Sequence, residues 1–276
     1  MSTVVLGDIG GHKDVLDLVL RDIGVGADNR LSDDVTVVQV GDLVRAQPRY
    51  RETNTAIVQR VDDITRANPP GRWVQLIGNH ENPPLGGPAS PNWTVGDEVF
   101  TEECRSILHR WWANKTMVLA HSVAGRLITH AGLTREQWKR LGCPASARET
   151  ADLLNRDCCN DLAAFAHPGR LVTGITTPSA DCMWAEINHE LLLPWVTSPD
   201  MPFTQIHGHG SPFRWPAETW WPDATESIRH RTVVRHDLRR TTTHLPDGSP
   251  YCLSSVDWVL EDAGANRTWP FYRIAG

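Results

Sequence analysis

The stretch Gly78-Asn79-His80-Glu81 follows the apolar run Trp73-Val74-Gln75-Leu76-Ile77. A short apolar run closed by a Gly-Asn turn signal predicts a buried strand that carries the next residues to the edge of a sheet. At that edge Asn79 would offer a carbonyl oxygen, His80 an imidazole and Glu81 a carboxylate. Glycine and asparagine are also ordinary turn residues, so the stretch gains weight only from other strand ends.

Two earlier predicted strands deliver a similar pair of residues. Residues 3–6 form a β-branched run that ends in Gly7-Asp8, and residues 35–40 form a run that ends in Gly41-Asp42. Helical spacing of apolar residues follows the first pair, and a helix is predicted over residues 51–67. Three consecutive strand–turn–helix units predict an α/β sheet whose strand ends share one edge, where such sheets place their ligands.

Two later predicted strands end in histidine. Residues 126–129 lead into His130, and residues 203–206 lead into His207-Gly208-His209. Further short β-rich runs near the end of the chain predict a second sheet packed against the first. We predict one domain over residues 1–276, with three possible loop insertions, near residues 82–96, 168–200 and 212–230.

Composition narrows the class of protein. The chain has 276 residues, of which 40% are hydrophobic and 22% charged, as in an ordinary globular protein. Its net charge of -6 predicts neither a nucleic-acid nor an acidic-membrane partner. The sequence has no apolar run near ~18 residues and no basic stretch before an apolar segment at its start, so we expect a cytoplasmic protein without a membrane partner. Its six cysteines contain no Cys-x-x-Cys pair, which argues against a cysteine zinc site.

The five strand ends together supply a set of metal-binding groups, namely Asp8, Asp42, Asn79, His130 and His209. Carboxylate, amide and imidazole groups bind divalent Mn, Fe, Zn or Mg, and the mixed nitrogen and oxygen set favours the first three. Two metals about 3.5–4 Å apart need a bridging carboxylate, for which Asp42 on a central strand is the natural candidate. Each residue alone is more often a turn or capping residue, so the prediction rests on the combination.

These motifs resemble the calcineurin-like metallophosphoesterases, and within them the branch of serine/threonine protein phosphatases and diadenosine tetraphosphatases. The resemblance covers most of residues 3–212, and residues 183–186 look like the tryptophan-containing segment of the protein phosphatases. Of the five matching motifs, Gly-Asn-His-Glu and His-Ala-Gly-Leu are specific for the family, whereas a Gly-Asp pair alone is a weak signal. The motifs are Gly7-Asp8, Gly41-Asp42, Gly78-Asn79-His80-Glu81, Thr129-His130-Ala131-Gly132-Leu133 and Gly208-His209.

The resemblance implies a four-layer α/β sandwich of two mixed sheets flanked by helices, with two divalent metal ions at the sheet edge, Mn²⁺ before Fe, Zn or Mg. Asp42 would bridge the metals and Asp8 would hold the first. The second would be held by Asn79, His130 and His209. The implied reaction is in-line attack on phosphorus by a hydroxide activated by both metals, without a covalent enzyme intermediate.

Two further residues receive catalytic roles from the resemblance. His80 would protonate the leaving oxygen, and an arginine would hold the phosphoryl oxygens. Related enzymes carry that arginine two positions before the proline that matches Pro48, which falls on Ala46 here, so Arg45, one position early, is the candidate. The protein phosphatases also have an aspartate in this motif that orients the histidine, and none is present.

The ligands of the first metal also depart from the family pattern, because Gly10 stands where the family has a histidine ligand. His12, two residues further on, and His207, in a His-x-His pair with His209, could replace that ligand. The alternatives are that His12 is a helix-start residue and that His207 is a buried strand residue.

The sequence predicts a metal-dependent phosphoesterase, foremost a phosphomonoesterase of protein-phosphatase type that acts on a phosphoprotein or a small phosphate ester. Glu81 favours this type, since the related tetraphosphatases tend to have aspartate there. One alternative is a dinucleoside polyphosphate or other nucleotide hydrolase. The other is a degenerate phosphatase-fold protein that binds a phosphorylated partner without cleaving it, which the changes at Gly10 and Ala46 keep open.

Overall fold

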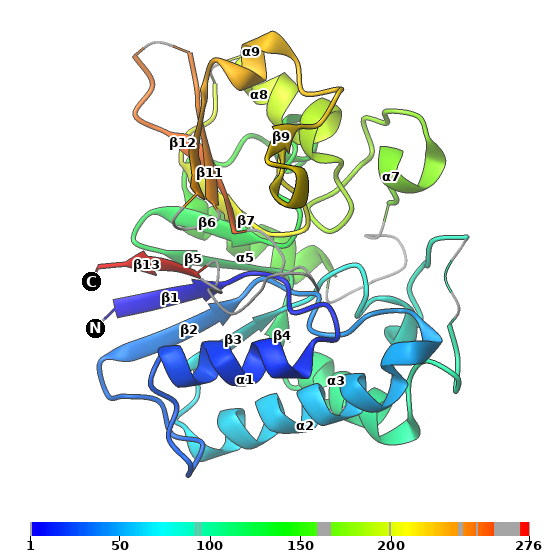
Figure 1. Cartoon of the computed structure of the whole chain (residues 1–276). Coiled ribbons are helices and arrows are strands. Elements are labelled where there is room, and N and C mark those ends of the chain that lie inside the picture. The colour runs from blue at the N-terminus through cyan, green and yellow to red at the C-terminus, as the bar shows by residue number, and fades with distance from the viewer. Residues whose placement is uncertain are drawn as a thin grey trace.

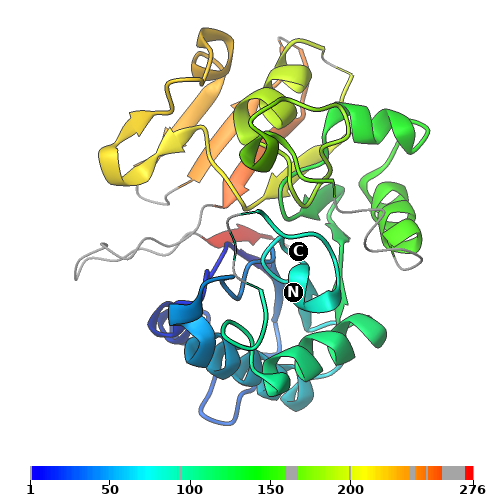
Figure 2. The same cartoon turned by 90° about the vertical axis from the view of Figure 1, so that its right-hand side faces the viewer.

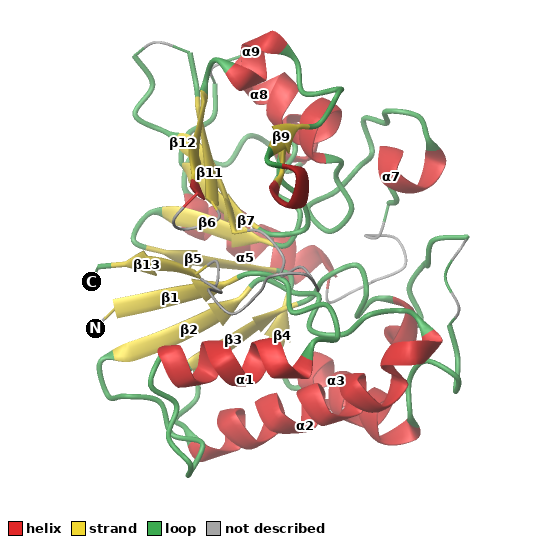
Figure 3. Cartoon of the chain, viewed as in Figure 1, coloured by secondary structure: helices red, strands yellow, loops and turns green. Residues whose placement is uncertain are grey.

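The computed structural model describes residues 2–91, 93, 95–158, 167–198, 200–236, 240–246, 248–256 and 271–275. Two mixed β-sheets pack against each other, and helices lie outside them (Figure 1). Figure 3 shows strands in the middle of the molecule and helices at its periphery. The predicted α/β sandwich of two mixed sheets flanked by helices is therefore confirmed.

The first sheet carries the three strands from the N-terminal third of the chain. Its order is β13-β1-β2-β3-β4, with β1 to β4 parallel and β13 antiparallel to β1. Both faces are covered, so four of the five residues in β1 and four of the five in β2 are buried. The strands are β1 (Ser2–Leu6), β2 (Val35–Gln39), β3 (Trp73–Leu76), β4 (Met117–Val118) and β13 (Phe271–Ile274).

Three helices cover the outer face of the first sheet, and Figure 2 shows them in the lower half of the molecule. They are α1 (Lys13–Asp22), α2 (Arg51–Ala67) and α3 (Glu102–Ala113). The predicted helix over residues 51–67 is confirmed at both ends, and it buries one apolar face that includes Ile57 and Val61. Of the helices in the described ranges, none combines the length and the apolar character that crossing a membrane needs.

The second sheet has the order β10-β11-β12-β7-β6-β5, with β12, β7 and β6 parallel. A fully buried apolar cluster joins the two sheets, with Val5 and Val38 from the first and Ile128 and Ile206 from the second. The predicted second sheet is confirmed. Its strands are β5 (Ala120–Val123), β6 (Arg126–Thr129), β7 (Thr204–His207), β10 (Thr232–Arg235), β11 (Arg240–His244) and β12 (Cys252–Val256).

Shorter elements complete the outer layer and the loops. α5 packs on β5 and β6, where Asn155 accepts hydrogen bonds from the backbone nitrogens of Leu119 and Ala120, both at 3.0 Å. A π-helix (Ile187–Leu192) and the hairpin of β8 and β9 lie in two of the predicted insertion segments. In the described ranges, the remaining α-helices and strands are α4 (Arg135–Arg140), α5 (Ala147–Cys158), α7 (Arg170–Thr173), α8 (Leu193–Val196), α9 (Glu226–Arg229), β8 (Phe213–Arg214) and β9 (Thr219–Trp220).

The carboxyl ends of the parallel strands in both sheets meet at one edge. The backbone nitrogens of Ile9 and Gly10, after β1, donate to the carbonyl oxygen of Asp42, after β2, at 3.0 and 2.7 Å. The backbone nitrogen of Gly208, after β7, donates to the carbonyl oxygen of His130, after β6, at 2.8 Å. Backbone hydrogen bonds therefore tie the loop after β1 to the loop after β2, and the loop after β7 to the loop after β6.

Candidate metal centre

The turns after β2 and β3 touch backbone to backbone, and glycine permits that approach. Gly41 has a φ of 103°, and a Cβ atom built on it would lie 2.6 Å from the Gly78 nitrogen. A Cβ atom on Gly78 would lie 2.2 Å from Asp42 Oδ1. Asp42 has a φ of 53°, which non-glycine residues adopt mainly at special sites. These turns place Asp42 directly against the Gly-Asn-His-Glu segment.

Glu81 fastens the two turns together instead of facing the sheet edge. Its side chain is fully buried, and Oε2 accepts hydrogen bonds from the backbone nitrogens of Asp42 (2.7 Å) and Gly78 (2.8 Å). Oε1 accepts from the nitrogen of Val44 at 3.0 Å. Burial raises the pKa of Glu81, while these backbone donors oppose that change. Glu81 therefore acts as an internal support for Asp42.

Glu81→Gln is expected to lower the free energy of unfolding by about 1–3 kcal/mol, because glutamine keeps only one of the two acceptor oxygens and turns an amide donor toward a backbone donor. Urea unfolding of chelator-treated protein would measure this loss. Glu52→Gln is the matched control, since the Glu52 side chain is 80% exposed. An unchanged unfolding midpoint in Glu81→Gln would contradict the supporting role.

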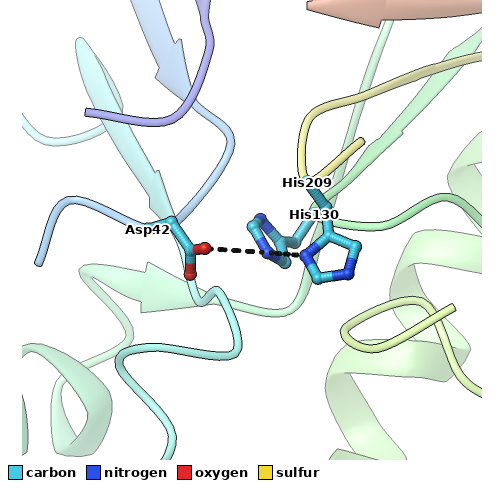
Figure 4. Close-up of side chains that lie close together, drawn as sticks. All are labelled: Asp42, His130 and His209. Atoms are coloured by element: carbon cyan, nitrogen blue, oxygen red, sulfur yellow. Dashed lines mark hydrogen bonds and ion pairs between the residues drawn. The ribbon is translucent and has the colours of Figure 1, made fainter. Parts of the chain in front are cut away.

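Asp42, His130 and His209 form a compact cluster of metal-capable groups. One ligand atom from each lies within 4.8 Å of the others. Figure 4 shows the Asp42 carboxylate facing the two imidazoles. Asp42 Oδ2 lies 3.5 Å from His130 Nε2, which lies 3.0 Å from His209 Nδ1. One carboxylate and two imidazoles at this spacing can hold a divalent cation.

The backbone orients His130 for this role. Its ring is fully buried, and Nδ1 lies 3.0 Å from the carbonyl oxygen of Val40, so the Nδ1 proton is donated there. Nε2 then carries a lone pair and faces the cluster, as in imidazoles that ligate a metal. Burial, followed by the charge of His209, lowers the pKa of His130 well below its ordinary value and favours the neutral, metal-binding form.

His209 is held in an unusual backbone conformation, with a φ of 62°. Its backbone nitrogen donates to both oxygens of Asp8, at 3.1 Å each. Its Nε2 is buried and has no hydrogen-bond partner among the described residues. Burial, followed by the charge of His207, lowers the pKa of His209 to about 4. Buried polar nitrogens without a hydrogen-bond partner are unusual in folded proteins. A bound metal ion would supply the missing partner of His209 Nε2.

The amide of Asn79 faces the same point. Its oxygen lies 3.2 Å from His130 Nε2 and faces only other acceptor atoms. A cation bound between these acceptors would interact favourably with all of them. Without a cation the amide is satisfied only by turning over, so that its nitrogen donates to the Asp42 oxygens at 3.1 and 3.0 Å. The donor chemistry of Asn79 therefore fits a cation next to Asp42 and His130.

Asp8 lies beside the cluster and is largely buried. A Cβ atom on Gly208 would lie 2.3 Å from Asp8 Oδ1, so the close approach of the β1 and β7 turns requires glycine there. Burial, followed by the charges of Asp8 and Glu81, raises the pKa of Asp42 well above its ordinary value. Buried carboxylates this close repel one another, and a cation would relieve that repulsion.

The two histidines considered as replacements for the ligand missing at Gly10 lie outside the cluster. His207 is buried, and its Nδ1 lies 3.0 Å from the carbonyl oxygen of Gly208. His12 packs edge-on against Tyr50, with ring centroids 5.4 Å apart. In the described ranges, neither joins Asp42, His130 and His209 in a group of metal-capable atoms. Replacement of the missing ligand thus gains no support from that cluster.

His80 lies at the rim of the centre with its Nε2 directed inward. The backbone nitrogen of Ala46 donates to His80 Nδ1 at 3.0 Å, so the ring proton must sit on Nε2. That nitrogen lies 4.0 Å from Asp42 Oδ2. Burial, followed by the charges of Arg45 and His209, lowers the pKa of His80 to about 3. The charge of Arg45 is thus felt at His80.

A second group of metal-capable side chains, Glu186, His189 and Asp223, has a simpler explanation. Glu186 begins the π-helix and accepts hydrogen bonds from the backbone nitrogens of Asn188 (2.8 Å) and His189 (2.7 Å). His189 Nδ1 lies 3.0 Å from Glu186 Oε2. These contacts are those of a helix cap, and Glu186 uses both of its oxygens for them.

A cavity of about 570 Å³ opens next to the centre. It lies between the π-helix segment and the β8–β9 hairpin, and it shares His209 with the metal-capable cluster. Its walls include Ser211, Trp215, Trp221 and Arg170. The part of a substrate that is not transferred could occupy this space.

The structure thus brings Asp42, Asn79, His130 and His209 together, with Asp8 alongside. Their roles as ligands stay predictions, as do the catalytic roles of His80 and Arg45. Sequence reasoning missed Trp93, whose ring lies on that of His80, and it placed Glu81 at the sheet edge instead of inside. No periodicity marks such contacts, because they are made by loop residues.

The chain is similar in sequence to known proteins over part of its length. A symmetrical bis(5'-nucleosyl)-tetraphosphatase of Actinobacillus pleuropneumoniae serotype 3 (strain JL03) is 30% identical over 159 residues, which are 56% of this chain and 53% of that relative. The chain therefore spans about half the length of the curated relatives that it matches.

Solved structures show the same fold at low identity. A serine/threonine phosphatase from Saccharomyces cerevisiae has a TM-score of 0.50 at 16% identity, covering 92% of this chain and 66% of that one. A cold-active protein tyrosine phosphatase has a TM-score of 0.51 at 14% identity, covering 90% and 77%. The family model for calcineurin-like phosphoesterases matches residues 1–252. As its strand-end motifs predicted, this chain belongs to the calcineurin-like phosphoesterase family.

Proposed function

We propose that this protein is a metal-dependent phosphoesterase that hydrolyses phosphate monoesters, either on a phosphoprotein or as small esters. One observation carries the proposal: Asp42, His130 and His209 converge within 4.8 Å, with a buried His209 nitrogen that has no partner in the described part of the chain. Family membership supports the same reading. A cytoplasmic location and a single domain over residues 1–276 stay predictions.

Two divalent cations, Mn²⁺ foremost, would be held by a set of five residues, namely Asp8, Asp42, Asn79, His130 and His209. When bound, they would lower the pKa of water and polarise the phosphoryl group. His80 would donate a hydrogen bond from Nε2–H to the leaving oxygen and stabilise the charge that builds there, because the Ala46 amide keeps the proton on that nitrogen. Arg45 would hold phosphoryl oxygens and stabilise the charge that builds on them.

A nucleotide substrate is the second candidate. It is favoured by the relative named as a bis(5'-nucleosyl)-tetraphosphatase and by the cavity beside His209, whose tryptophan walls suit a flat ring. Product analysis after incubation with a phosphopeptide and with a dinucleoside tetraphosphate would separate the two. Inorganic phosphate from the peptide alone supports the first, and nucleoside diphosphates support the second.

Removal and return of metal tests the proposal itself. We expect protein treated with a chelator to lose hydrolysis of p-nitrophenyl phosphate and to regain it with Mn²⁺, because the cluster supplies ligands but no nucleophile of its own. Elemental analysis of the same samples should follow the activity. Turnover that survives complete metal removal would contradict the proposal. Absence of both metal and turnover under every divalent ion tried would favour the non-cleaving, phosphate-binding alternative.

A further inference from the structure

An aromatic stack leads from the protein interior to His80. The His80 and Trp93 rings lie nearly parallel, with centroids 4.0 Å apart and an angle of 15° between their planes. Trp93 in turn stacks on Trp184, at 5.4 Å and 28°. Trp184 is 1% exposed, so the stack is anchored in the core. The His80 side chain itself is 16% exposed.

The contacts that His80 makes in the plane of its ring do not fix the orientation of that plane. Nδ1 accepts one hydrogen bond, from the Ala46 amide, and Nε2 points toward Asp42 at 4.0 Å. A single hydrogen bond at one ring nitrogen permits rotation about that contact, and the second side-chain torsion of histidine is intrinsically broad. A flat contact against the ring face restricts this rotation. The Trp93 indole supplies such a contact.

The loop that carries Trp93 is held in place by its own hydrogen bonds. Asn82 Nδ2 donates to the carbonyl oxygen of Pro88 at 2.9 Å, and the Gly87 nitrogen donates to the carbonyl oxygen of Asn82 at 3.1 Å. The Trp93 nitrogen donates to the carbonyl oxygen of Ser90 at 2.9 Å. Trp93 is thus tied back to the segment that follows His80, thirteen residues earlier in the chain.

We propose that Trp93 is a positioning residue that keeps the His80 imidazole in the plane from which Nε2 reaches the leaving oxygen. The inference rests on the proposed phosphoesterase function and names a residue that shapes it. In the described ranges, the hydrogen bond to His80 Nδ1 comes from the Ala46 amide and not from a carboxylate. The ring is therefore oriented by an amide at one edge and an indole on one face.

A leaving-group test separates positioning from a structural role. p-Nitrophenolate is a stable anion that departs without a proton, whereas phenolate gains from protonation as it leaves. Trp93→Ala is expected to lower kcat for phenyl phosphate by about 10–10²-fold, because a misplaced group loses part of its catalytic contribution, and to change kcat for p-nitrophenyl phosphate far less. Trp93→Phe should restore most of the loss, since it keeps a flat ring.

Two further comparisons complete the test. In a His80→Ala background, Trp93→Ala should cause no additional loss, because both changes act through the same group. Trp112→Ala, a half-buried tryptophan on α3, is the matched control for loss of an indole and should leave the ratio of the two kcat values unchanged. Metal content should equal that of the unmodified protein in all variants.

Other outcomes overturn the inference. Equal losses on both esters, or an added loss in the His80→Ala background, would show that Trp93 acts elsewhere. If the unmodified protein hydrolyses neither ester with any divalent cation, the proposed function fails first, and the positioning role falls with it. If it hydrolyses both while Trp93→Ala keeps the ratio, only the positioning role fails.

Discussion

Asp42→Asn is expected to abolish both metal binding and hydrolysis. Asp42 supplies the carboxylate of the metal-capable cluster, and its buried charge is unfavourable beside Asp8 and Glu81 unless a cation offsets it. Losing the metals forfeits several kcal/mol of transition-state stabilisation, which corresponds to about 10³-fold or more in rate. Elemental analysis and p-nitrophenyl phosphate turnover measure the two losses.

Asp42→Asn removes the charge of the side chain while keeping its shape. Asparagine has nearly the same size as aspartate and tolerates the φ of 53° found at this position better than most residues. The chelator-treated variant should therefore unfold at a temperature no lower than the chelator-treated unmodified protein. Adding Mn²⁺ should raise the melting temperature of the unmodified protein only, because a ligand that binds the native state stabilises it.

Asp33→Asn serves as the control for Asp42→Asn, since Asp33 is exposed in the loop before β2. It should retain metal and turnover. Undiminished turnover in Asp42→Asn would remove the assignment of this cluster as the metal centre, whatever the behaviour of the control.

His80→Ala is expected to lower kcat for phenyl phosphate by about 10²–10⁴-fold while leaving metal content unchanged. Its Nε2 faces Asp42 at 4.0 Å, yet it lies outside the cluster formed by Asp42, His130 and His209. A group in that place can serve the leaving oxygen without holding the cation. The backbone nitrogen of residue 80, which donates to Asp42 Oδ1 at 3.0 Å, is kept in the variant.

The control for His80→Ala is His109→Ala, an exposed histidine on α3. Steady-state kinetics with phenyl phosphate and elemental analysis apply to both variants. Loss of metal in His80→Ala would make His80 a ligand instead of a proton donor. An unchanged kcat would show that the leaving oxygen takes its proton from another source, such as water.

The Ala46 amide occupies the place at His80 Nδ1 where the protein phosphatases would have the orienting aspartate. A carboxylate at Nδ1 would accept a proton from the imidazole, whereas the amide of Ala46 donates one to it. His80 therefore presents a neutral ring with its proton on Nε2. The sequence shows that the aspartate is absent, but only the folded backbone shows that a donor occupies its place.

Local sequence patterns were enough to predict the main elements and the sheet edge at which the candidate ligands meet. The apolar faces of α2 and the β-branched runs of β1 and β2 are local patterns, and local patterns fix element type. Asp42, Asn79, His130 and His209 were predictable as a group because the carboxyl ends of parallel strands lie together.

The contacts that support those residues form only when the chain folds. Glu81 turns inward to bind three backbone nitrogens, and Trp93 covers the face of His80. β13 pairs with β1 although the two strands lie at opposite ends of the chain. These contacts depend on how loops close and which segments become neighbours after folding. That is a property of the whole packed chain, so neither spacing nor residue type could reveal it.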